Sequence, residues 1–472
     1  MTDSAPGQET RAAWAWLVLL LAAAILPGHG LLWNHGCAHE PTSPPWVRSV
    51  RDVLFCGALI VLIPCAWRLR TAVSRAGWRT LACAALPLAA LVALGLIHVL
   101  HGRDWPEVAQ HEWRNPCLYI VVVPLAVTLF VRPVLSPSVL IASASILAAW
   151  FLLLAVLWPR ATMEWTDLEH PASATARLIG HFERGPNLAL IALCTWLWSA
   201  ASLPLVRPWM AAGWTGLAAA CLVLSASAAG YIAAAGSALA LMLMPTLRHA
   251  LWVIRWQLVA GLAIATLLVG VVVWRVPITG VDRLFNRTTA LAIAAIDTHA
   301  HGPGTTDWTN ARAIMEQAEK ISSTGASSVS SRDFQHRLVW ANLTGAGWFS
   351  GSEMLVGDLH TTNYRRFDSQ YLNVAYNAGL LGLCCLFATI AFAAWWWILA
   401  WRRRPAARSE LAFLAVAALL ILGPFWLTAA FQQRYPINLL TCLIAARIWF
   451  LSYAVTAEDL PPSHPLPRES SA

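Results

Sequence analysis

Apolar runs of roughly 18 residues recur along almost the whole chain, and a run of that length can cross a bilayer as a helix. Short polar turns separate most of these runs, which predicts an all-α polytopic membrane protein. The first run, from Trp14 to Leu32, lacks the small-residue cleavage pattern of a signal peptide, so we interpret it as a retained helix. We expect twelve spans, at residues 13–33, 52–67, 80–101, 115–131, 137–158, 186–203, 210–228, 230–247, 257–274, 370–395, 411–431 and 437–455.

One polar segment is much longer than the others and divides the chain. Helical patterns at 310–321 and 331–343 predict short helices inside this segment. The tail of the chain is rich in proline and serine, which predicts disorder. The expected parts are nine spans in residues 1–274, the long loop in 275–369, three spans in 370–455 and the disordered tail in 456–472.

Charged residues make up 12% of the chain and hydrophobic residues 58%, whereas a soluble domain carries about twice that charged fraction. The basic residues are nearly all arginines. Many of them fall in short turns on one predicted side of the membrane, namely 68–75, 248–255, 401–408, Arg132 and Arg207. The positive-inside rule makes this side cytoplasmic, with both termini, and places the long loop outside. Because topology explains the net charge of +8, no nucleic-acid partner is expected.

Further arginines recur at the outer ends of the predicted spans, where the positive-inside tendency disfavours them. A guanidinium group offers a fixed fork of donors that matches phosphate oxygens. These arginines therefore favour a pocket for a lipid diphosphate at the outer leaflet. The alternatives are ion pairs with acidic residues of the same loops, or contacts with membrane lipids. The set comprises Arg114, Arg177, Arg184, Arg275, Arg283, Arg287, Arg337, Arg365 and Arg366.

Two polar segments that lead into predicted spans carry more specific patterns. Before the sixth span, Gly185 and Pro186 indicate a helix entry, and Asn187 can satisfy free backbone groups there. Before the tenth span, Asp368 follows two arginines, and it is either a functional carboxylate or a helix N-cap. His336, on the predicted helix 331–343, could exchange protons near neutral pH or could be a solvated helix histidine.

In order along the chain, these motifs resemble the O-antigen ligase/polymerase family of bacterial inner-membrane glycosyltransferases. The resemblance covers roughly residues 170–395. It rests on R-x-x-G-x-F-x-x-x-P-N (177–187), H-R-L-V-W (336–340), G-A-G-W (345–348), D-S-Q-Y-L (368–372) and G-L-L-G (379–382). The family's donor is a glycan on undecaprenyl diphosphate, and the acceptor is a sugar hydroxyl of a glycan or of the lipid A core. The resemblance implies neither a metal nor another cofactor.

The resemblance also implies roles for individual residues. Asp368 would act as base or orienting group, together with His336 and Arg337. Gly185, Pro186 and Asn187 would shape the loop. The donor diphosphate would be held by Arg177, Arg184, Arg365 and Arg366.

Ligases of the family usually carry a histidine where this chain has Asp368, so polymerisation is favoured over ligation to the lipid A core. Transfer to protein and a role as a flippase or transporter of lipid-linked glycans stay open as alternatives. A chain-length regulator stays open as a further partner.

Overall fold

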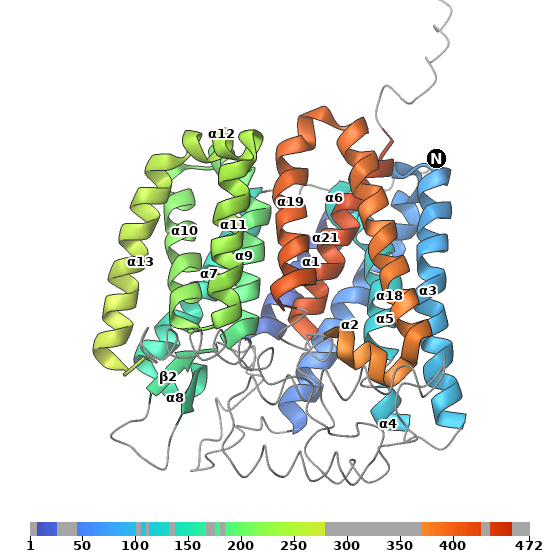
Figure 1. The fold of residues 1–472 in the computed structure, drawn as a ribbon, viewed down its shortest axis with the longest axis horizontal. Coiled ribbons are helices and arrows are strands. Elements are labelled where there is room, and N and C mark those ends of the chain that lie inside the picture. Colours follow the sequence, from blue (N-terminus) through green and yellow to red (C-terminus); the bar gives the residue numbers. More distant parts are fainter. Residues whose placement is uncertain are drawn as a thin grey trace, which may run out of the picture.

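The computed structural model describes residues 7–25, 45–100, 105–109, 113–131, 137–166, 175–179, 185–278, 370–425 and 435–455. These residues form a bundle of long helices that run side by side (Figure 1). The principal helices are α1 (Gly7–Ile25), α2 (Pro45–Arg68), α3 (Arg75–Leu100), α5 (Arg114–Leu125), α6 (Val127–Val131), α7 (Pro137–Leu157), α9 (Gly185–Ala200), α10 (Pro208–Leu224), α11 (Ala228–Leu243), α12 (Pro245–Val253), α13 (Arg255–Arg275), α18 (Gln370–Arg403), α19 (Arg408–Leu420) and α21 (Tyr435–Tyr453).

Several of these helices are long and apolar enough to cross a membrane, so the prediction of a helical membrane protein is confirmed. In the described part of the chain six helices meet this criterion, or seven if α11 and α12 count as one bent span. Five shorter apolar helices accompany them, at 11–24, 116–131, 187–200, 208–224 and 438–453. Each stretch predicted from the sequence overlaps one of these helices. The short helices predicted at 310–321 and 331–343, and the tail 456–472, lie outside the described residues.

The outward-facing side chains of the bundle are themselves apolar. Val53, Leu86 and Leu267 are each at least 67% exposed, although they lie within long helices rather than in turns. A water-soluble bundle would place polar residues on such faces. The interior is also apolar, with Trp16, Phe151, Phe413 and Trp449 at most 2% exposed. Helices whose inward and outward faces are both apolar are expected when lipid surrounds the bundle.

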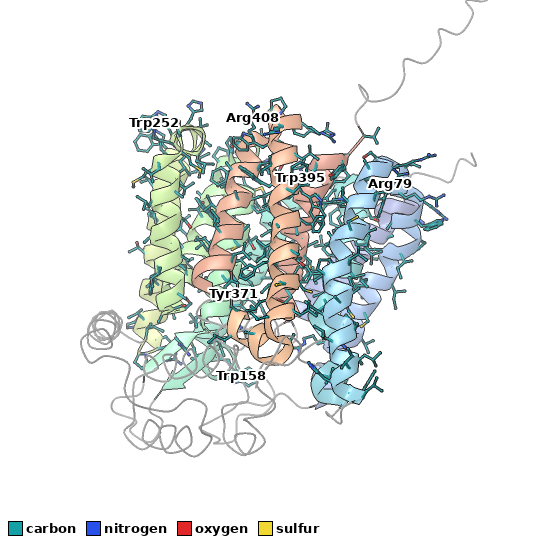
Figure 2. The ribbon with its side chains drawn as sticks, turned by 45° about the vertical axis from the view of Figure 1, so that its right-hand side comes forward. Arg79, Trp158, Trp252, Tyr371, Trp395 and Arg408 are labelled. Atoms are coloured by element: carbon teal, nitrogen blue, oxygen red, sulfur yellow. The ribbon has the colours of Figure 1, made fainter. Side chains whose placement is uncertain are left out.

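The two ends of the bundle differ. One end carries η1 (Leu69–Ala72), α12 and η6 (Pro405–Ala407), and therefore the arginine-rich turns; we name it the arginine end. The opposite end carries α4 (Trp105–Val108), α8 (Pro159–Thr162) and a β-hairpin; we name it the loop end. Figure 1 shows the arginine end at the top and the loop end at the bottom, and Figure 2 places Arg79 and Arg408 at the top as well.

Arginines of the α18–α19 turn also have a structural role at the arginine end. Arg403 Nη1 donates to Ser452 O at 3.2 Å, and Arg404 Nε donates to Leu451 O at 3.2 Å. Arg404 Nη2 donates to Ala454 O. The last carbonyl groups of a helix have no partner within the helix and carry partial negative charge, so these cations stabilise the C-terminus of α21.

The hairpin at the loop end is the one sheet in the described residues, and the sequence did not predict it. Strand β1 (Met163–Thr166) pairs antiparallel with β2 (Thr175–Leu178). The pairing continues one step beyond the strands, because Ile179 N donates to Thr162 O at 2.8 Å. On the outer edge of β2, Ala176 N donates to Pro277 O, also at 2.8 Å. The second bond ties the hairpin to the chain just after α13.

Candidate functional site: an apolar cavity with an arginine

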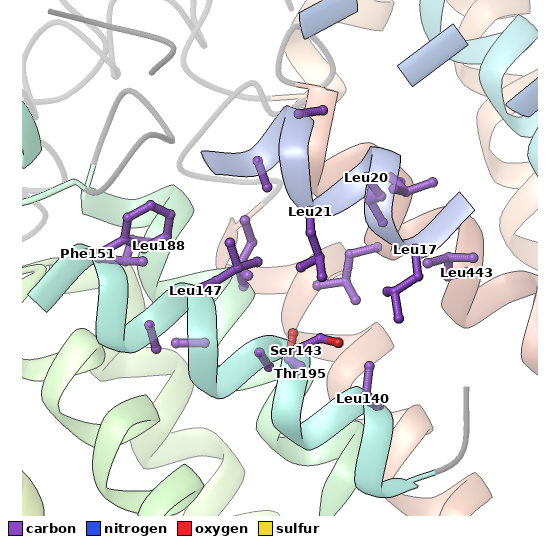
Figure 3. Close-up of a pocket in the computed structure, with 18 of the residues that line it drawn as sticks. Leu17, Leu20, Leu21, Leu140, Ser143, Leu147, Phe151, Leu188, Thr195 and Leu443 are labelled. Carbon is purple, nitrogen blue, oxygen red and sulfur yellow. The ribbon is translucent and has the colours of Figure 1, made fainter. Parts of the chain in front are cut away.

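A cavity of about 190 Å³ lies between α1, α7, α9 and α21 (Figure 3). One face of α7 forms its long wall, through residues spaced three or four apart, which places them in one stripe of a helix. The stripe consists of Leu140, Ser143, Ala144, Leu147, Ala148 and Phe151. With a rise of 1.5 Å per residue, the stripe is about 16 Å long. The small side chains in its middle leave the space that the cavity occupies.

The other walls come from helices that are distant in sequence. Helix α1 contributes Leu17, Leu20 and Leu21, which Figure 3 shows opposite α7. Helix α9 contributes Leu188 and Thr195, and α21 contributes Leu443. The result is a narrow apolar space inside the bundle, with few polar groups along its length.

Arg51 is the one charged side chain in the lining of this cavity. It lies in the second turn of α2 and is half-buried. The N-terminal end of α2 lies at the loop end of the bundle (Figure 1), so Arg51 is carried by the part of α2 nearest that end. An ionisable side chain in an apolar membrane region is a functional-site candidate by default, since its presence there is costly.

The start of α9 connects this cavity with residues that the sequence singled out. Gly185, Pro186 and Asn187 form its first helical positions, as the Gly-Pro signal predicted. Asn187 is 2% exposed, and the next residue, Leu188, lines the cavity. Arg177 lies on β2, which contacts α9, and its register partner on β1 is Glu164. The structure therefore brings the Arg177 strand and the 185–187 turn together at the loop end.

A broken helix shapes the same end of the bundle. Helix α18 is interrupted at Gly379, whose φ of 60° and ψ of −155° are accessible to glycine almost alone. Gly382 is needed for the same break, because a Cβ atom on it would clash with Ala378 Cβ. The two glycines of the G-L-L-G motif thus have a steric explanation. The apolar membrane-crossing part of α18 begins at Ala378, eight residues later than the sequence predicted.

The part of α18 that precedes the break folds back and is held in place. Tyr371 packs its ring on Phe387, with 6.1 Å between ring centroids. Its hydroxyl donates to Leu422 O at 2.6 Å, and Leu422 lies in the π-helical turn η7 (Ile421–Phe425) that follows α19. Because Leu422 is in an irregular turn, its carbonyl oxygen can accept this bond. The sequence R-R-F-D-S directly precedes this held segment.

The remaining predicted site residues lie outside the described residues, and their roles stay predictions. They are Arg184, His336, Arg337, Arg365, Arg366 and Asp368. Among the described residues, no group of three or more His, Cys, Asp or Glu side chains is placed to hold a metal ion.

Arg51 was absent from the residues that the sequence selected, although the same signal was available. It stands at the outer edge of the predicted second span, as the selected arginines do at other spans. Only the packing of the helices around the cavity shows that its side chain lines that space.

No protein-family model matches this sequence, and no curated protein matches it at a significant level. The resemblance to the O-antigen ligase/polymerase family therefore stays a prediction, and the argument about function rests on the cavity and its surroundings.

Proposed function

We propose that this protein is a membrane glycosyltransferase that takes its glycan from undecaprenyl diphosphate and extends a sugar chain, as a polymerase does. In this proposal the twelve predicted spans all cross a bacterial inner membrane. The arginine end and both termini face the cytoplasm, in accordance with the positive-inside rule. The loop end, with the hairpin and the long segment 275–369, faces the periplasm and holds the reaction site.

The observation that carries the proposal is the combination of the apolar cavity with Arg51. A polyisoprenoid chain is apolar and narrow, so a cavity with a wall about 16 Å long can take several of its units. The diphosphate at the end of such a chain needs cationic donors, and guanidinium groups pair well with phosphate oxygens. Arg51 lines the cavity from the second turn of α2, which begins at the loop end, and would supply such a donor. A diphosphate headgroup bound to Arg51 would leave the attached glycan outside the hydrocarbon region of the membrane.

The chemistry follows from this placement. The acceptor hydroxyl attacks the anomeric carbon of the donor sugar, a new glycosidic bond forms, and the bond from that carbon to the diphosphate oxygen breaks. Negative charge develops on the leaving diphosphate, and preorganised cations in a water-poor site can stabilise it by several kcal/mol. Arg51 and Arg177, with Arg184, Arg365 and Arg366, would supply that stabilisation. Asp368 would accept or orient the hydroxyl proton, assisted by His336 and Arg337.

In this proposal, the break in α18 at the G-L-L-G motif has a positioning role. The break and the Tyr371–Leu422 hydrogen bond hold the first turns of α18 at the loop end. These turns follow directly after Arg365, Arg366 and Asp368, so they would fix the point at which the charged segment leaves the bundle. Gly379, Gly382 and Tyr371 would then be positioning residues for the donor headgroup.

The test is reconstitution of the full-length protein in proteoliposomes with an undecaprenyl-diphosphate-linked repeat unit and, in a second arm, lipid A core. We expect lipid-linked chains of two or more repeats, with release of undecaprenyl diphosphate. Transfer to lipid A core alone would instead assign a ligase. Movement of the intact lipid-linked repeat between leaflets without bond cleavage would assign a flippase, and no change in either substrate would contradict the proposal.

A further inference from the structure

Helix α12 has a different orientation from the rest of the bundle. Its axis is bent by 98° from that of α11, so it lies across the arginine end instead of continuing through the bundle (Figure 1). Leu247 and Ile254 are at most 1% exposed and anchor the helix to the protein. Its remaining side is open. A helix with one anchored apolar face that lies flat at the end of a membrane bundle is placed at the level of the lipid headgroups.

The open side of α12 is cationic. Arg248, His249 and Arg255 are all exposed there. The sequence between Arg184 and Val281 contains no aspartate or glutamate, so the surrounding elements α9 to α13 supply no counter-charge. The neighbouring helix α19 contributes Glu410, but that carboxylate accepts two hydrogen bonds from Arg447, at 2.8 and 3.0 Å. This carboxylate, on a helix that contacts α12, is thus engaged by Arg447 rather than by the arginines of this surface.

Two exposed tryptophans lie beside these cationic side chains. Trp252 and Trp256 are 65% and 71% exposed, and the Arg255 guanidinium lies 4.5 and 5.9 Å from the centroids of their rings. Arg255 Nη1 also donates to Trp252 O at 3.0 Å, which fixes the group in place. Tryptophan side chains favour the membrane interface because the ring is largely apolar and the N–H is polar. Below this surface, Val259 and Leu262 of α13 are each 58% exposed and continue the apolar face into the bilayer region.

We propose that the surface formed by Arg248, His249, Trp252, Arg255 and Trp256 binds the headgroup of an anionic phospholipid of the cytoplasmic leaflet. The phosphate contacts the two guanidinium groups, the tryptophan rings lie beside the glycerol region, and the acyl chains run along Val259 and Leu262. An acidic segment of a soluble protein would satisfy the arginines but not the exposed apolar residues that extend toward the membrane. This inference depends on the chain spanning a membrane and not on the glycosyltransfer reaction.

The experiment measures lipid retained by the full-length protein. The protein is purified after equilibration in mixed micelles with equal amounts of phosphatidylglycerol and phosphatidylcholine, and bound lipids are counted by native mass spectrometry. The test variant is Arg248→Gln with Arg255→Gln. The matched control is Arg75→Gln with Arg79→Gln, which removes two exposed arginines of α3 at the same end of the bundle.

We expect wild type and the control to retain phosphatidylglycerol over phosphatidylcholine, and the test variant to lose about 30-fold in that preference. This value corresponds to about 1 kcal/mol for each arginine near a membrane surface. Arg248→Lys with Arg255→Lys should keep most of the preference, which separates lost charge from a folding defect. Excess inorganic phosphate should not displace the lipid, because the acyl chains contribute to binding. Equal lipid preference in all variants, or none in wild type, would overturn the proposal.

Discussion

Two cavities of similar size, about 190 and 150 Å³, lie against different faces of α21. The first, the α7 cavity, contains Arg51. The second, the α3 cavity, is formed by α3, α5, α18, α19 and α21, and its lining has no charged residue. An apolar space in a membrane protein is compatible with imperfect packing or with any lipid chain. Ionisable side chains are rare in such apolar spaces and often mark functional sites, so the charge makes the α7 cavity the better candidate for a substrate site.

The largest expected effect concerns that charge. Arg51→Gln should lower the rate of glycan transfer by about 10²- to 10³-fold, which is typical when one group that stabilises developing negative charge is removed. Arg51→Lys should retain part of the activity, because the charge stays while the fork of donors is lost. Transfer rates in proteoliposomes check this. Arg79→Gln, which removes an exposed arginine of α3 at the arginine end, is the control and should change the rate less than about threefold. If the Arg51 variant and the control variant lost the same factor in transfer rate, Arg51 would have no specific role in stabilising the leaving diphosphate.

The two cavities can also be filled in a matched way. Ala144→Trp adds an indole ring to the α7 cavity, and Ala393→Trp adds the same group to the α3 cavity. Overfilling costs about 1 to 3 kcal/mol of stability in either place. Only Ala144→Trp should also block the donor chain and reduce transfer by about tenfold or more per folded molecule. Turnover normalised to the folded fraction separates the two effects, and a larger loss from Ala393→Trp would assign the donor to the α3 cavity.

A smaller effect is expected at the broken helix that forms part of the α3 cavity. Gly379→Ala should lower the free energy of unfolding by about 2 kcal/mol, because alanine is strained at the dihedral angles found there. Gly236→Ala is the control, since a Cβ atom on this residue of α11 meets nothing within 4 Å, and alanine should stabilise the helix by up to about 1 kcal/mol. Thermal unfolding in detergent compares the two variants. Opposite signs are predicted, and a neutral Gly379→Ala would argue against the break.

The smallest effect concerns the ion pair between α19 and α21, at a helix shared by both cavities. Arg447 contacts both carboxylate oxygens of Glu410, and the two side chains are 22% and 20% exposed. A double-mutant cycle with Glu410→Gln and Arg447→Met should give a coupling energy of about 1 kcal/mol. Neither side chain lines a cavity, so transfer per folded molecule should not change. A coupling energy near zero would show that the contact does not stabilise the fold.

The sequence predicted the helical membrane fold well, but it indicated the candidate cavity only through the start of α9. Apolar runs locate the helices because bilayer thickness fixes their length, and the Gly185–Pro186 pair located the start of α9. The hairpin was missed, since its strands are only four residues long and contain no repeated alternation. The break at Gly379 was missed because the surrounding residues are uniformly compatible with a helix. The α7 cavity depends on residues of α1, α7, α9 and α21 that meet only after packing, so no local pattern indicates it.

The most direct test of the account uses a photoactivatable isoprenoid diphosphate bound to the full-length protein in proteoliposomes, followed by peptide mapping of the cross-links. If the donor lipid occupies the α7 cavity, cross-links will fall on α1, α7 and α9, and Arg51→Gln and Ala144→Trp will each reduce them strongly. Cross-links on α3 and α18 that are unaffected by these two substitutions would contradict the account, because the lipid would then occupy the uncharged cavity.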